Sequence, residues 1–526
     1  MADSTRTQTK DENEGKPRTV MEFLKSNQTR TAFFLFLALL GRAMILITVI
    51  PTIILELVND DDAHATKIAA ITQCGQRAIA FCVQPGIGHA TDVFGRKPIA
   101  TITQLCVATA VLFLGFKPPL WILIIVLVGQ GAYDGISTVS ASMVADWKAN
   151  AAASRQAHSF GVLYGIAGVS FVFGAGLGGA LNEVFGPSVP CFLAAAIHYG
   201  SAAYLNFFCG ESRPAHVLEE ARETGCLDAV DPITPLSLVR EIEGVWQLIL
   251  PFLFGEATMA VFGVWFYILD YNYDWGVVEV TIFITVAGIL IAAAQVVGTK
   301  HLVPKVFSPA QAVLVASMVQ CAAFSAYALA PVGWSIYLIL VLTAGVGSIG
   351  APSLRGILTS MAPPEQQGSL QGALQGLSQL TNAFMALVYG GAFSAGTSPF
   401  WKEHLGGHFA GLPLLIAAFL HLMQHLSVRG AIAGLKELNL LDADSRERYS
   451  MPMPKASSFN GRASNLSSSI NGIVNAMRSS KSAPQHEFFS ADGGGARNPM
   501  RAAAQVELSD ERRERPAAEG AGGITF

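Results

Sequence analysis

The sequence predicts an all-α membrane protein with twelve transmembrane helices, and composition and patterning carry this prediction. Of the 526 residues, 51% are hydrophobic and 14% are charged, whereas soluble globular chains carry roughly 25% charge. The apolar residues gather in runs of about 20, the length that crosses a hydrocarbon layer of about 30 Å. Backbone groups in lipid must bond within their own segment, and the period-2 alternation of a barrel is absent, so the runs should be helices.

Short polar turns separate these runs, and they fix the boundaries between neighbouring spans. Lys117-Pro118-Pro119 and Pro331 are two such turns, since proline cannot continue a helix from within. The twelve expected spans cover residues 33–57, 68–88, 98–116, 119–145, 157–182, 188–209, 246–269, 277–300, 309–330, 332–354, 369–394 and 409–428.

A polar, acidic linker over residues 210–245 divides the chain into two halves of six spans each. Six plus six spans indicate two repeats, so we expect two pseudo-symmetric six-helix bundles at 31–209 and 246–428. Residues 1–30 form an N-terminal segment. Residues 429–526 are rich in Ser, Ala, Gly, Arg and Glu and poor in aromatic side chains. A tail of this composition cannot bury enough apolar surface to offset chain entropy, so we predict that it is disordered.

The distribution of Lys and Arg among the loops predicts the orientation. One set of loops contains Arg96, Lys97, Lys148, Arg155, Lys300, Lys305 and Arg355. The other set contains Lys117, Lys402, Lys67 at a boundary, and the acidic run Asp60-Asp61-Asp62. Positive loops stay on the cytoplasmic side. We therefore expect the first set and both termini to be cytoplasmic, in the plasma membrane or an endomembrane.

The turn GHATDVFGRK at residues 88–97 joins two of the apolar runs. Gly88 lets backbones approach, Gly95 permits a positive φ, and Asp92 can cap a helix start. With Arg96 and Lys97, this pattern resembles the loop between helices 2 and 3 of the major facilitator superfamily. The resemblance implies a gating loop that contacts the opposite bundle when the protein is open to the outside. The simpler alternative is a tight turn with retained positive charge.

Two further stretches extend the resemblance. Residues 161–179 are similar to the fifth-helix antiporter motif of that superfamily, with matches at Gly161, Gly174, Gly178 and Gly179. Ser170 and Ala175 depart from it, and a glycine-rich packing face is the alternative. Residues 352–374 resemble the loop between helices 10 and 11 of the tetracycline-antiporter branch and its hippocampus-abundant-transcript-like relatives. The residues that carry this match include Pro352, Gln367, Gly368, Gln371 and Gly372.

Four ionisable residues lie inside expected spans: Arg42, Arg77, Asp134 and Glu256. Each is roughly 10 residues from the cytoplasmic end of its span. At about 1.5 Å per residue this is about 15 Å, half of the hydrocarbon layer. Buried ionisable groups are costly and mark pathways. The resemblance places Arg42, Asp134 and Glu256 around a central cavity, with Arg77 nearby.

The charges support a hypothesis about coupling. Asp134 or Glu256 would carry a coupling proton, and Arg42 and Arg77 would pair with these acids or hold an anionic substrate. The alternative is a structural ion pair, such as Arg42 with Asp134.

The aromatic cluster of residues 265–275 indicates an interfacial belt, with stacking on a substrate ring as the alternative. His421 and His425 share a helix face without a third ligand, so we predict no metal site.

These observations together predict a secondary active transporter of a small organic solute, not an enzyme. No P-loop pattern is present, so no ATP-binding site is expected. We expect no cofactor, and we expect a proton to be the coupling ion. Net charge of −4 without a basic patch argues against nucleic acid. The expected partners are the substrate, the lipid bilayer and regulators of the tail, and we expect a monomer. Antiport of drugs or metabolites competes with uptake of an organic anion or sugar. An alternative of another class is a non-transporting receptor or scaffold that acts through the tail.

Overall fold

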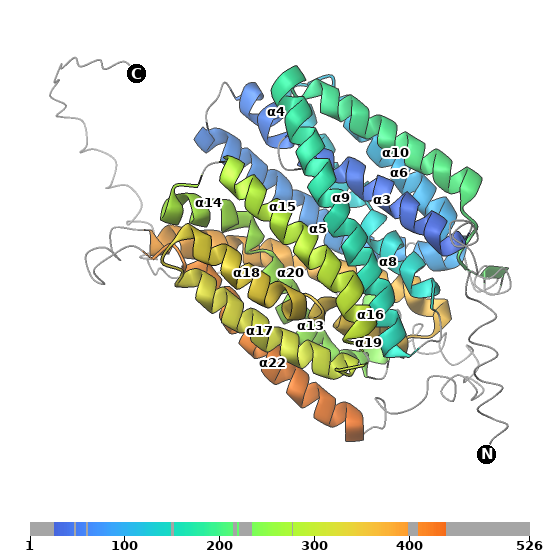
Figure 1. Ribbon diagram of the computed structural model, residues 1–526. Helices are drawn as coiled ribbons and strands as arrows, with labels where there is room; N and C mark the ends of the chain where they lie inside the picture. The colour runs from blue at the N-terminus through green and yellow to red at the C-terminus, as the bar shows by residue number, and fades with distance from the viewer. Residues whose placement is uncertain are drawn as a thin grey trace, which may run out of the picture. The chain divides into compact units, whose positions relative to one another are not determined.

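The computed structural model describes the central part of the chain, and every structural statement below concerns that part. The regular elements there are helices, with no strand among the described residues (Figure 1). The described residues are 26–46, 49–58, 62–148, 152–213, 218–219, 234–242, 244–275, 277–303, 305–397 and 409–437.

Several predictions concern residues outside this part of the chain. They include Asp60, Asp61, Pro214, Lys402, most of the N-terminal segment and the tail beyond residue 437. The side chains of Asp62, Lys67 and Phe266 are likewise outside the description.

The N-terminal half contains long helices at all six expected positions. They are α3 Asn27–Leu46 with α4 Val49–Leu57, α5 Asp62–Phe94, α6 Arg96–Leu114, α7 Leu120–Tyr133 with α8 Ile136–Asp146, α9 Ala153–Phe185 and α10 Ser188–Phe208.

The C-terminal half follows the same plan after a short linker helix, α12 Thr234–Glu241. Its elements are α13 Val245–Met259 with α14 Phe262–Tyr273, α15 Val277–Ala293 with the π-helix η2 Ala294–Gly298 and α16 Thr299–His301, α17 Pro309–Ala328, α18 Gly333–Gly347 with α19 Gly350–Met361, the 3₁₀ turn η3 Pro364–Gln366, α20 Gln367–Gly396 and α22 Leu412–Glu437.

The prediction of an all-α membrane fold is confirmed. Within the described ranges, nine helical segments are long and apolar enough to cross a membrane. The remaining expected spans correspond to α5, α10 and α20, which are helical at their predicted positions but more polar. Their polar side chains serve contacts between helices: for example, Gln84 of α5 and Gln371 of α20 are buried and hydrogen-bonded.

Four of the expected spans each consist of two helices, which the apolar pattern did not predict. These are the first, fourth, seventh and tenth spans, built as α3–α4, α7–α8, α13–α14 and α18–α19. The interruptions fall at Asp134-Gly135, at Ala260-Val261 and at Ser348-Ile349, with residues 47–48 outside the description. The twelve spans divide into four successive groups of three, and each interrupted span is the first of its group. This regular placement agrees with an internally repeated architecture.

The predicted loops at 88–97 and 352–374 are wrong in their extent, because the helices continue into them. Helix α5 runs to Phe94 and α6 starts at Arg96, so the turn between them is Gly95 alone, with φ of +99°. Helix α19 runs to Met361, seven residues past the expected end of its span, and α20 starts at Gln367. Charged and amide side chains that bond across the interface lengthen these helices beyond the apolar runs.

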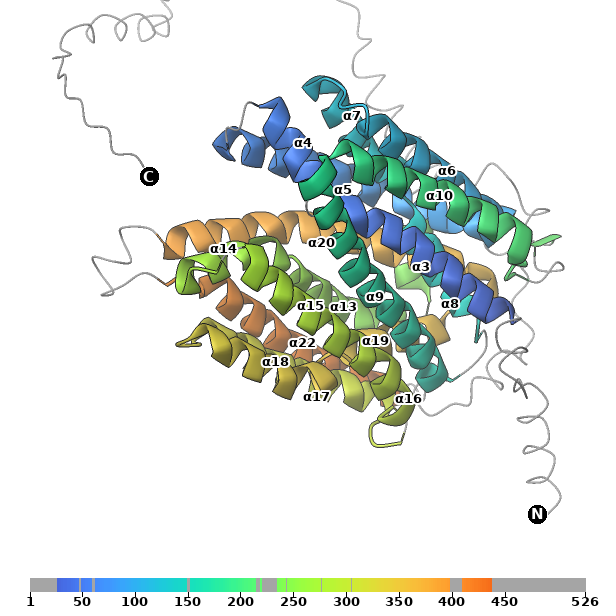
Figure 2. The same ribbon diagram turned by 45° about the horizontal axis from the view of Figure 1, so that its top comes forward.

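The two halves contact each other mainly toward one end of the helices. This is the end that carries Gly95 and the end of α8, and we call it the Gly95 end; the opposite end, near Lys117, is the Lys117 end. Helix α5 packs along α20, α8 also touches α20, and α9 packs against α15 and α19. Figures 1 and 2 both show α9 beside α15. Of the described elements toward the Lys117 end, α4 and α7 have their main contacts within the N-terminal half, and α14 and α18 within the C-terminal half.

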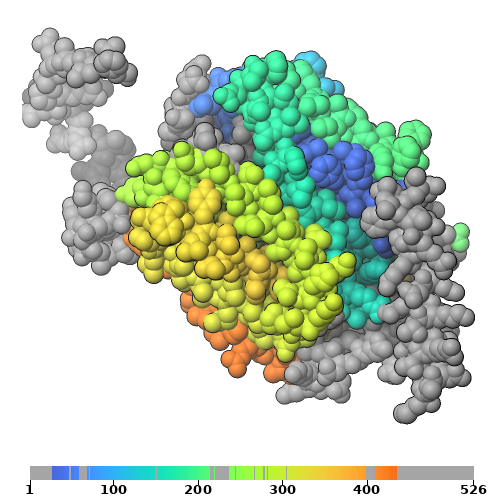
Figure 3. Space-filling view, in the orientation of Figure 1, coloured from blue at the N-terminus to red at the C-terminus, as the bar shows by residue number. Residues whose placement is uncertain are grey.

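The surface carries many large apolar side chains, as expected for helices that face lipid. Trp121 is 64% exposed, Phe207 82% and Leu342 71%. Figure 3 shows one face, on which α9 of the N-terminal half and α15 of the C-terminal half meet. A soluble protein rarely exposes apolar surface on this scale.

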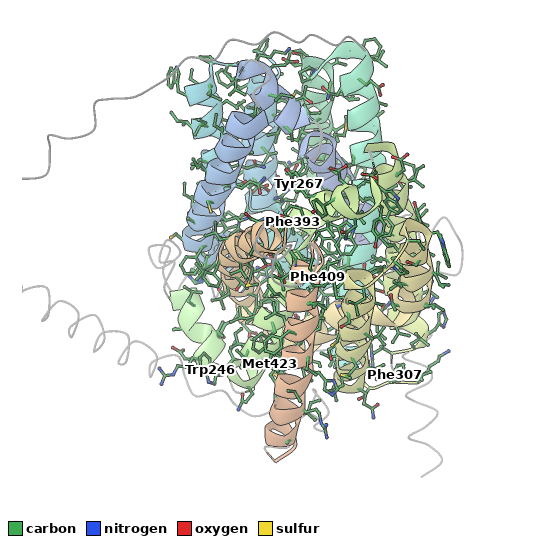
Figure 4. All side chains as sticks on the ribbon, turned by 90° about the vertical axis from the view of Figure 1, so that its left-hand side faces the viewer. Trp246, Tyr267, Phe307, Phe393, Phe409 and Met423 are labelled. Atoms are coloured by element: carbon green, nitrogen blue, oxygen red, sulfur yellow. The ribbon has the colours of Figure 1, made fainter. Side chains whose placement is uncertain are left out.

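The described aromatic residues of 265–275 are divided between the core of the C-terminal half and its surface: Trp265 is buried, Tyr273 and Trp275 are half-buried against that core, and Tyr267 and Tyr271 are exposed. Trp265 is 6% exposed and stacks on Phe283, with ring centroids 6.2 Å apart. Tyr267 is 48% exposed and lies near Phe393 of α20, as Figure 4 shows. The end of α14 is therefore held chiefly by ring packing.

Candidate functional site

An ion pair between Arg42 and Asp134 lies at the interruption between α7 and α8. Arg42 Nη1 of α3 is 3.1 Å from Asp134 Oδ2, and the side chains are 28% and 4% exposed. Gln130 Nε2 donates to the same oxygen at 3.2 Å. Asp134 Oδ1 is buried and has no hydrogen-bond partner in the described structure. One acceptor site of this carboxylate is therefore left for a proton or a ligand.

The interruption itself is stabilised by a neighbouring helix. Asp134 has φ of −86° and ψ of 78°, so the helix cannot continue through it. A broken helix leaves carbonyl groups without partners, and buried ones need replacement donors. Gln84 Nε2 of α5 donates to the Asp134 carbonyl at 2.9 Å, and Thr138 donates to Gln84 Oε1 at 2.5 Å. Asp134 is thus placed by backbone geometry as well as by its charge.

Arg77 of α5 is half-buried and lies within electrostatic range of Arg42. Within the described ranges it forms no ion pair and no hydrogen bond. The N-terminal half thus holds two guanidinium groups and one carboxylate near each other. Their sum is one positive charge, which favours a negatively charged ligand group.

Glu256 of α13 lies in the C-terminal half and forms a separate cluster. It is half-buried, and Ser378 of α20 donates to its Oε2. Asn382 Nδ2 donates to Ser378 Oγ at 3.3 Å. No ion pair among the described residues joins Glu256 to Arg42 or Arg77. The expected convergence of four charges thus resolves into one cluster in each half.

A pocket lies between α3 and α9, away from the four charged residues. It is lined by Phe36, Leu40, Val172, Phe173, Gly176 and Leu177. Its lining is apolar and includes none of the four charged residues.

Asp92 forms a second polar centre, at the Gly95 end, that joins the two halves. Its Oδ1 accepts from Arg96 Nη1 and Arg213 Nη1, both at 2.7 Å, and from the Gly368 backbone N–H at 2.9 Å. Its Oδ2 accepts from the backbone N–H and the hydroxyl of Ser369, at 2.6 and 2.7 Å. We call these five residues the Asp92 cluster. Asp92 does cap a helix start, but it caps α20 of the opposite half, where the helix dipole favours an anion.

Glycines allow the close approach that the Asp92 cluster requires. A Cβ added at Gly88 would overlap the backbone of Gly368 and would lie 2.7 Å from Gly372 Cα. Side chains at these positions would hold α5 and α20 apart and move Gly368 away from the Asp92 carboxylate. Gly88 and two residues of the 352–374 stretch therefore form one contact surface.

Arg96 anchors the cluster within the N-terminal half. The side chain is fully buried, and its Nε lies 3.0 Å from Asp146 Oδ2 at the end of α8. Glu211 caps the start of α6, because it accepts from the backbone N–H groups of Arg96 and Lys97, each at 3.0 Å. Lys97 Nζ closes the end of α10 by donating to the Cys209 carbonyl at 2.9 Å.

Arg213 brings the start of the linker into the cluster. It is 5% exposed, and its Nη2 donates to the Glu365 carbonyl of the C-terminal half at 3.0 Å. Burial lowers the pKa of the Arg213 guanidinium, and the nearby Asp92 carboxylate opposes this effect. No sequence pattern selects Arg213, since a basic residue is common directly after an apolar run.

The remaining residues of the 352–374 match support the start of α20. Pro352 is buried in α19. Gln367 Nε2 donates to the carbonyls of Thr359 and Ala362, at 3.0 and 2.9 Å. Gln371 accepts from Arg355 Nε at 3.0 Å. Arg355, expected in a cytoplasmic loop, is instead buried within α19.

The glycines of α9 serve close helix packing on two sides. Gly161 faces Gln295 and Thr299 of the C-terminal half, whereas Gly174 and Gly178 face α3. Gly179 is half-buried. A Cβ at Gly178 would overlap the carbonyl group of Met44.

Gly178→Ala should therefore destabilise the protein by about 1–3 kcal/mol, because α9 and α3 must separate. Gly176→Ala is the matched control, since nothing lies within 4 Å of a Cβ there. Alanine is the better helix former, by about 1 kcal/mol, so the control should be neutral or slightly stabilising. Thermal unfolding in detergent measures both, and equal midpoints for the two variants would contradict the packing role.

Comparisons with known proteins agree with this architecture. The model of the Major Facilitator Superfamily matches residues 31–386. Tetracycline resistance protein, class B, of Escherichia coli is 25% identical over 353 residues, which are 66% of this chain and 83% of that protein. Human hippocampus abundant transcript 1 protein is 24% identical over 340 residues, 63% of this chain and 66% of that protein. Among solved structures, the human organic anion transporter MFSD10 has a similar fold, with a TM-score of 0.64 and 17% identity, covering 76% of this chain and 98% of that one.

The relatives confirm the branch that residues 352–374 indicate. The family model covers the first span through most of α20, and thus both the Asp92 cluster and the Arg42–Asp134 pair. The chain belongs to the Major Facilitator Superfamily and is a membrane transporter rather than an enzyme.

Proposed function

We propose that this chain is a secondary active transporter that couples movement of a small organic solute to protons by alternating access. The observation that carries the proposal is the Arg42–Asp134 pair at an interrupted helix, in which one carboxylate oxygen has no hydrogen-bond partner among the described residues. A solute anion that competes for Arg42 would release the Asp134 carboxylate, and a released buried carboxylate takes up a proton. Solute binding and protonation would thereby be linked in one site.

The Asp92 cluster supplies the second element of the proposal, a contact that closes one side. It joins the halves at the Gly95 end, which the loop charges predict to be cytoplasmic. The described halves have no comparable hydrogen-bonded contact at the Lys117 end; the ion pair there, Lys117 with Glu56, lies within the N-terminal half. This asymmetry corresponds to a state closed toward the cytoplasm.

An organic anion is the substrate class that we favour. Arg42 pairs with Asp134, and Arg77 lies within electrostatic range of Arg42, so this region of the N-terminal half has an excess positive charge. The similar proteins point in two directions, to tetracycline resistance for one group and to organic anion transport for the structural neighbour.

Flux across proteoliposomes that contain the purified full-length protein tests the proposal. The solute panel would include carboxylates, sulfonates, sugars and amphipathic cations, with and without an imposed pH gradient. With one proton per solute, a gradient of one pH unit supports about tenfold accumulation of solute. Failure of every solute to respond to the pH gradient would contradict proton coupling.

Glu256→Gln should abolish or sharply reduce accumulation driven by the pH gradient, because the amide cannot exchange a proton. Solute exchange without a gradient should persist, since it needs no net proton movement. Glu279→Gln is the matched control, because Glu279 lies exposed on α15 of the same half. Wild-type accumulation in Glu256→Gln would contradict a role for Glu256 in coupling and leave that role to Asp134 alone.

A further inference from the structure

Arg355 is a buried cation without a carboxylate partner. It lies in α19 and is 7% exposed. Its Nε donates to Gln371 Oε1 at 3.0 Å and its Nη1 to Tyr164 Oη at 3.2 Å, and its guanidinium lies 5.8 Å from the centre of the Phe160 ring. Its Nη2 is buried and has no hydrogen-bond partner within the described ranges. No ion pair to Arg355 is formed there.

These contacts are divided between the two halves of the transporter. Gln371 belongs to the same half as Arg355, whereas Tyr164 and Phe160 belong to α9 of the opposite half. The two helices are in backbone contact, since a Cβ at Gly356 would lie 2.5 Å from the Ala157 nitrogen. Separation of the halves at the Gly95 end would therefore remove the Tyr164 hydrogen bond and the Phe160 ring together.

A buried charge that loses part of its contacts is destabilised unless a new partner is found. The Glu256 carboxyl lies within electrostatic range of Arg355. It lies on α13, which packs against α19 within the same half. Glu256 would therefore stay near Arg355 when α9 moves away, and its present partner is the neutral hydroxyl of Ser378.

We propose that Arg355 is a conformation-dependent counter-ion of Glu256: it bonds to Tyr164 while the Gly95 end is closed and pairs with the Glu256 carboxylate when that end opens. The step conserves charge, because the Glu256 carboxyl gives its proton to water at the open Gly95 end as the ion pair forms. On closure Arg355 returns to Tyr164, and Glu256 takes a proton from the Lys117 side. This inference rests on the proposed alternating access. Formation of the Arg355–Glu256 ion pair would link opening of the Gly95 end to release of the proton.

Labelling of Glu256 by dicyclohexylcarbodiimide tests the inference, because this reagent attacks the protonated form of a carboxyl in apolar surroundings. The labelled peptide is quantified by mass spectrometry as a function of pH, on purified full-length protein without substrate. Asp92→Asn provides the form open at the Gly95 end, verified by spin-label distances. We expect its labelling midpoint at least about one pH unit below that of the wild type, as for a carboxyl that gains a cationic partner.

The same shift should disappear in Asp92→Asn/Arg355→Gln and persist in Asp92→Asn/Arg355→Lys, which keeps the charge. Tyr164→Phe keeps the ring but removes the hydrogen bond to Arg355, so it should lower the labelling midpoint of Glu256 even in the closed form. This variant keeps the test valid if Arg355→Gln does not fold. An unchanged shift in Asp92→Asn/Arg355→Gln would overturn the inference. So would a loss of anion flux in Arg355→Gln with unaltered labelling, which would make Arg355 a substrate ligand. Absence of any solute flux in the wild type would instead contradict the proposed function and leave the labelling result valid.

Discussion

Asp92→Asn should shift the transporter toward the form open at the Gly95 end. The Asp92 carboxylate accepts five hydrogen bonds, and four of them come from the opposite half or the linker, two of these from Ser369. An asparagine has one acceptor oxygen and no charge, so Arg96 and Arg213 would lose their shared anion. Removal of one partner from a buried ion pair costs about 3–5 kcal/mol. Part of this cost is relieved when the halves separate and water reaches both arginines.

The expected population change is large. At about 1.4 kcal/mol per tenfold, the loss of 3 kcal/mol or so from the closed form changes the ratio of the two forms by roughly 10². Spin labels at Phe94 of α5 and Val306 of the C-terminal half would report the distance across the Gly95 end, since both side chains are exposed. The exposed Cys82 and Cys106 would first be replaced by serine.

Asp146→Asn is the matched control for this measurement. Asp146 also pairs with Arg96, at 3.0 Å, but its other described partner, Ser212, belongs to the start of the linker rather than to α20. This variant disturbs the same arginine without removing a contact to the opposite half. Equal distance distributions in Asp92→Asn and Asp146→Asn would contradict a specific role for Asp92 at the interface.

The positions of the spans could be predicted from the sequence, because lipid imposes a length and an apolar composition on each of them. The turn at Gly95 could also be predicted, since a positive φ there favours glycine. The interruptions at Asp134 and Ser348 could not, because a single apolar segment runs across each of them. A hydropathy pattern does not record where a helix bends.

The charged residues show the same division between local and long-range information. Counting residues from the span ends placed Arg42, Asp134 and Glu256 at one depth. Depth does not fix the direction of a side chain, and Glu256 in fact bonds to Ser378 in its own half. The bond between Arg355 and Tyr164 joins residues 191 positions apart, and that between Arg213 and Glu365 joins residues 152 apart. One sequence without an alignment contains no signal for such pairs.

Asp134→Asn should reduce proton-driven accumulation at least about tenfold and also destabilise the protein. The amide would leave Arg42 without its carboxylate partner and within electrostatic range of Arg77. Because Arg42 is 28% exposed, we expect a loss of about 1–3 kcal/mol, less than for a fully buried pair. Thermal unfolding of the purified protein and flux in proteoliposomes measure the two effects separately.

The double variant Arg42→Gln/Asp134→Asn separates transport from structure. Replacing both members of an ion pair removes the uncompensated charge, so the unfolding midpoint should return toward that of the wild type. Proton-driven accumulation should stay low, because neither the proton acceptor nor the guanidinium that would hold an anion remains. If the pair is only structural, the double variant should recover flux together with stability. Recovery of stability without flux is the result expected of a pair whose carboxylate and guanidinium take part in each transport cycle.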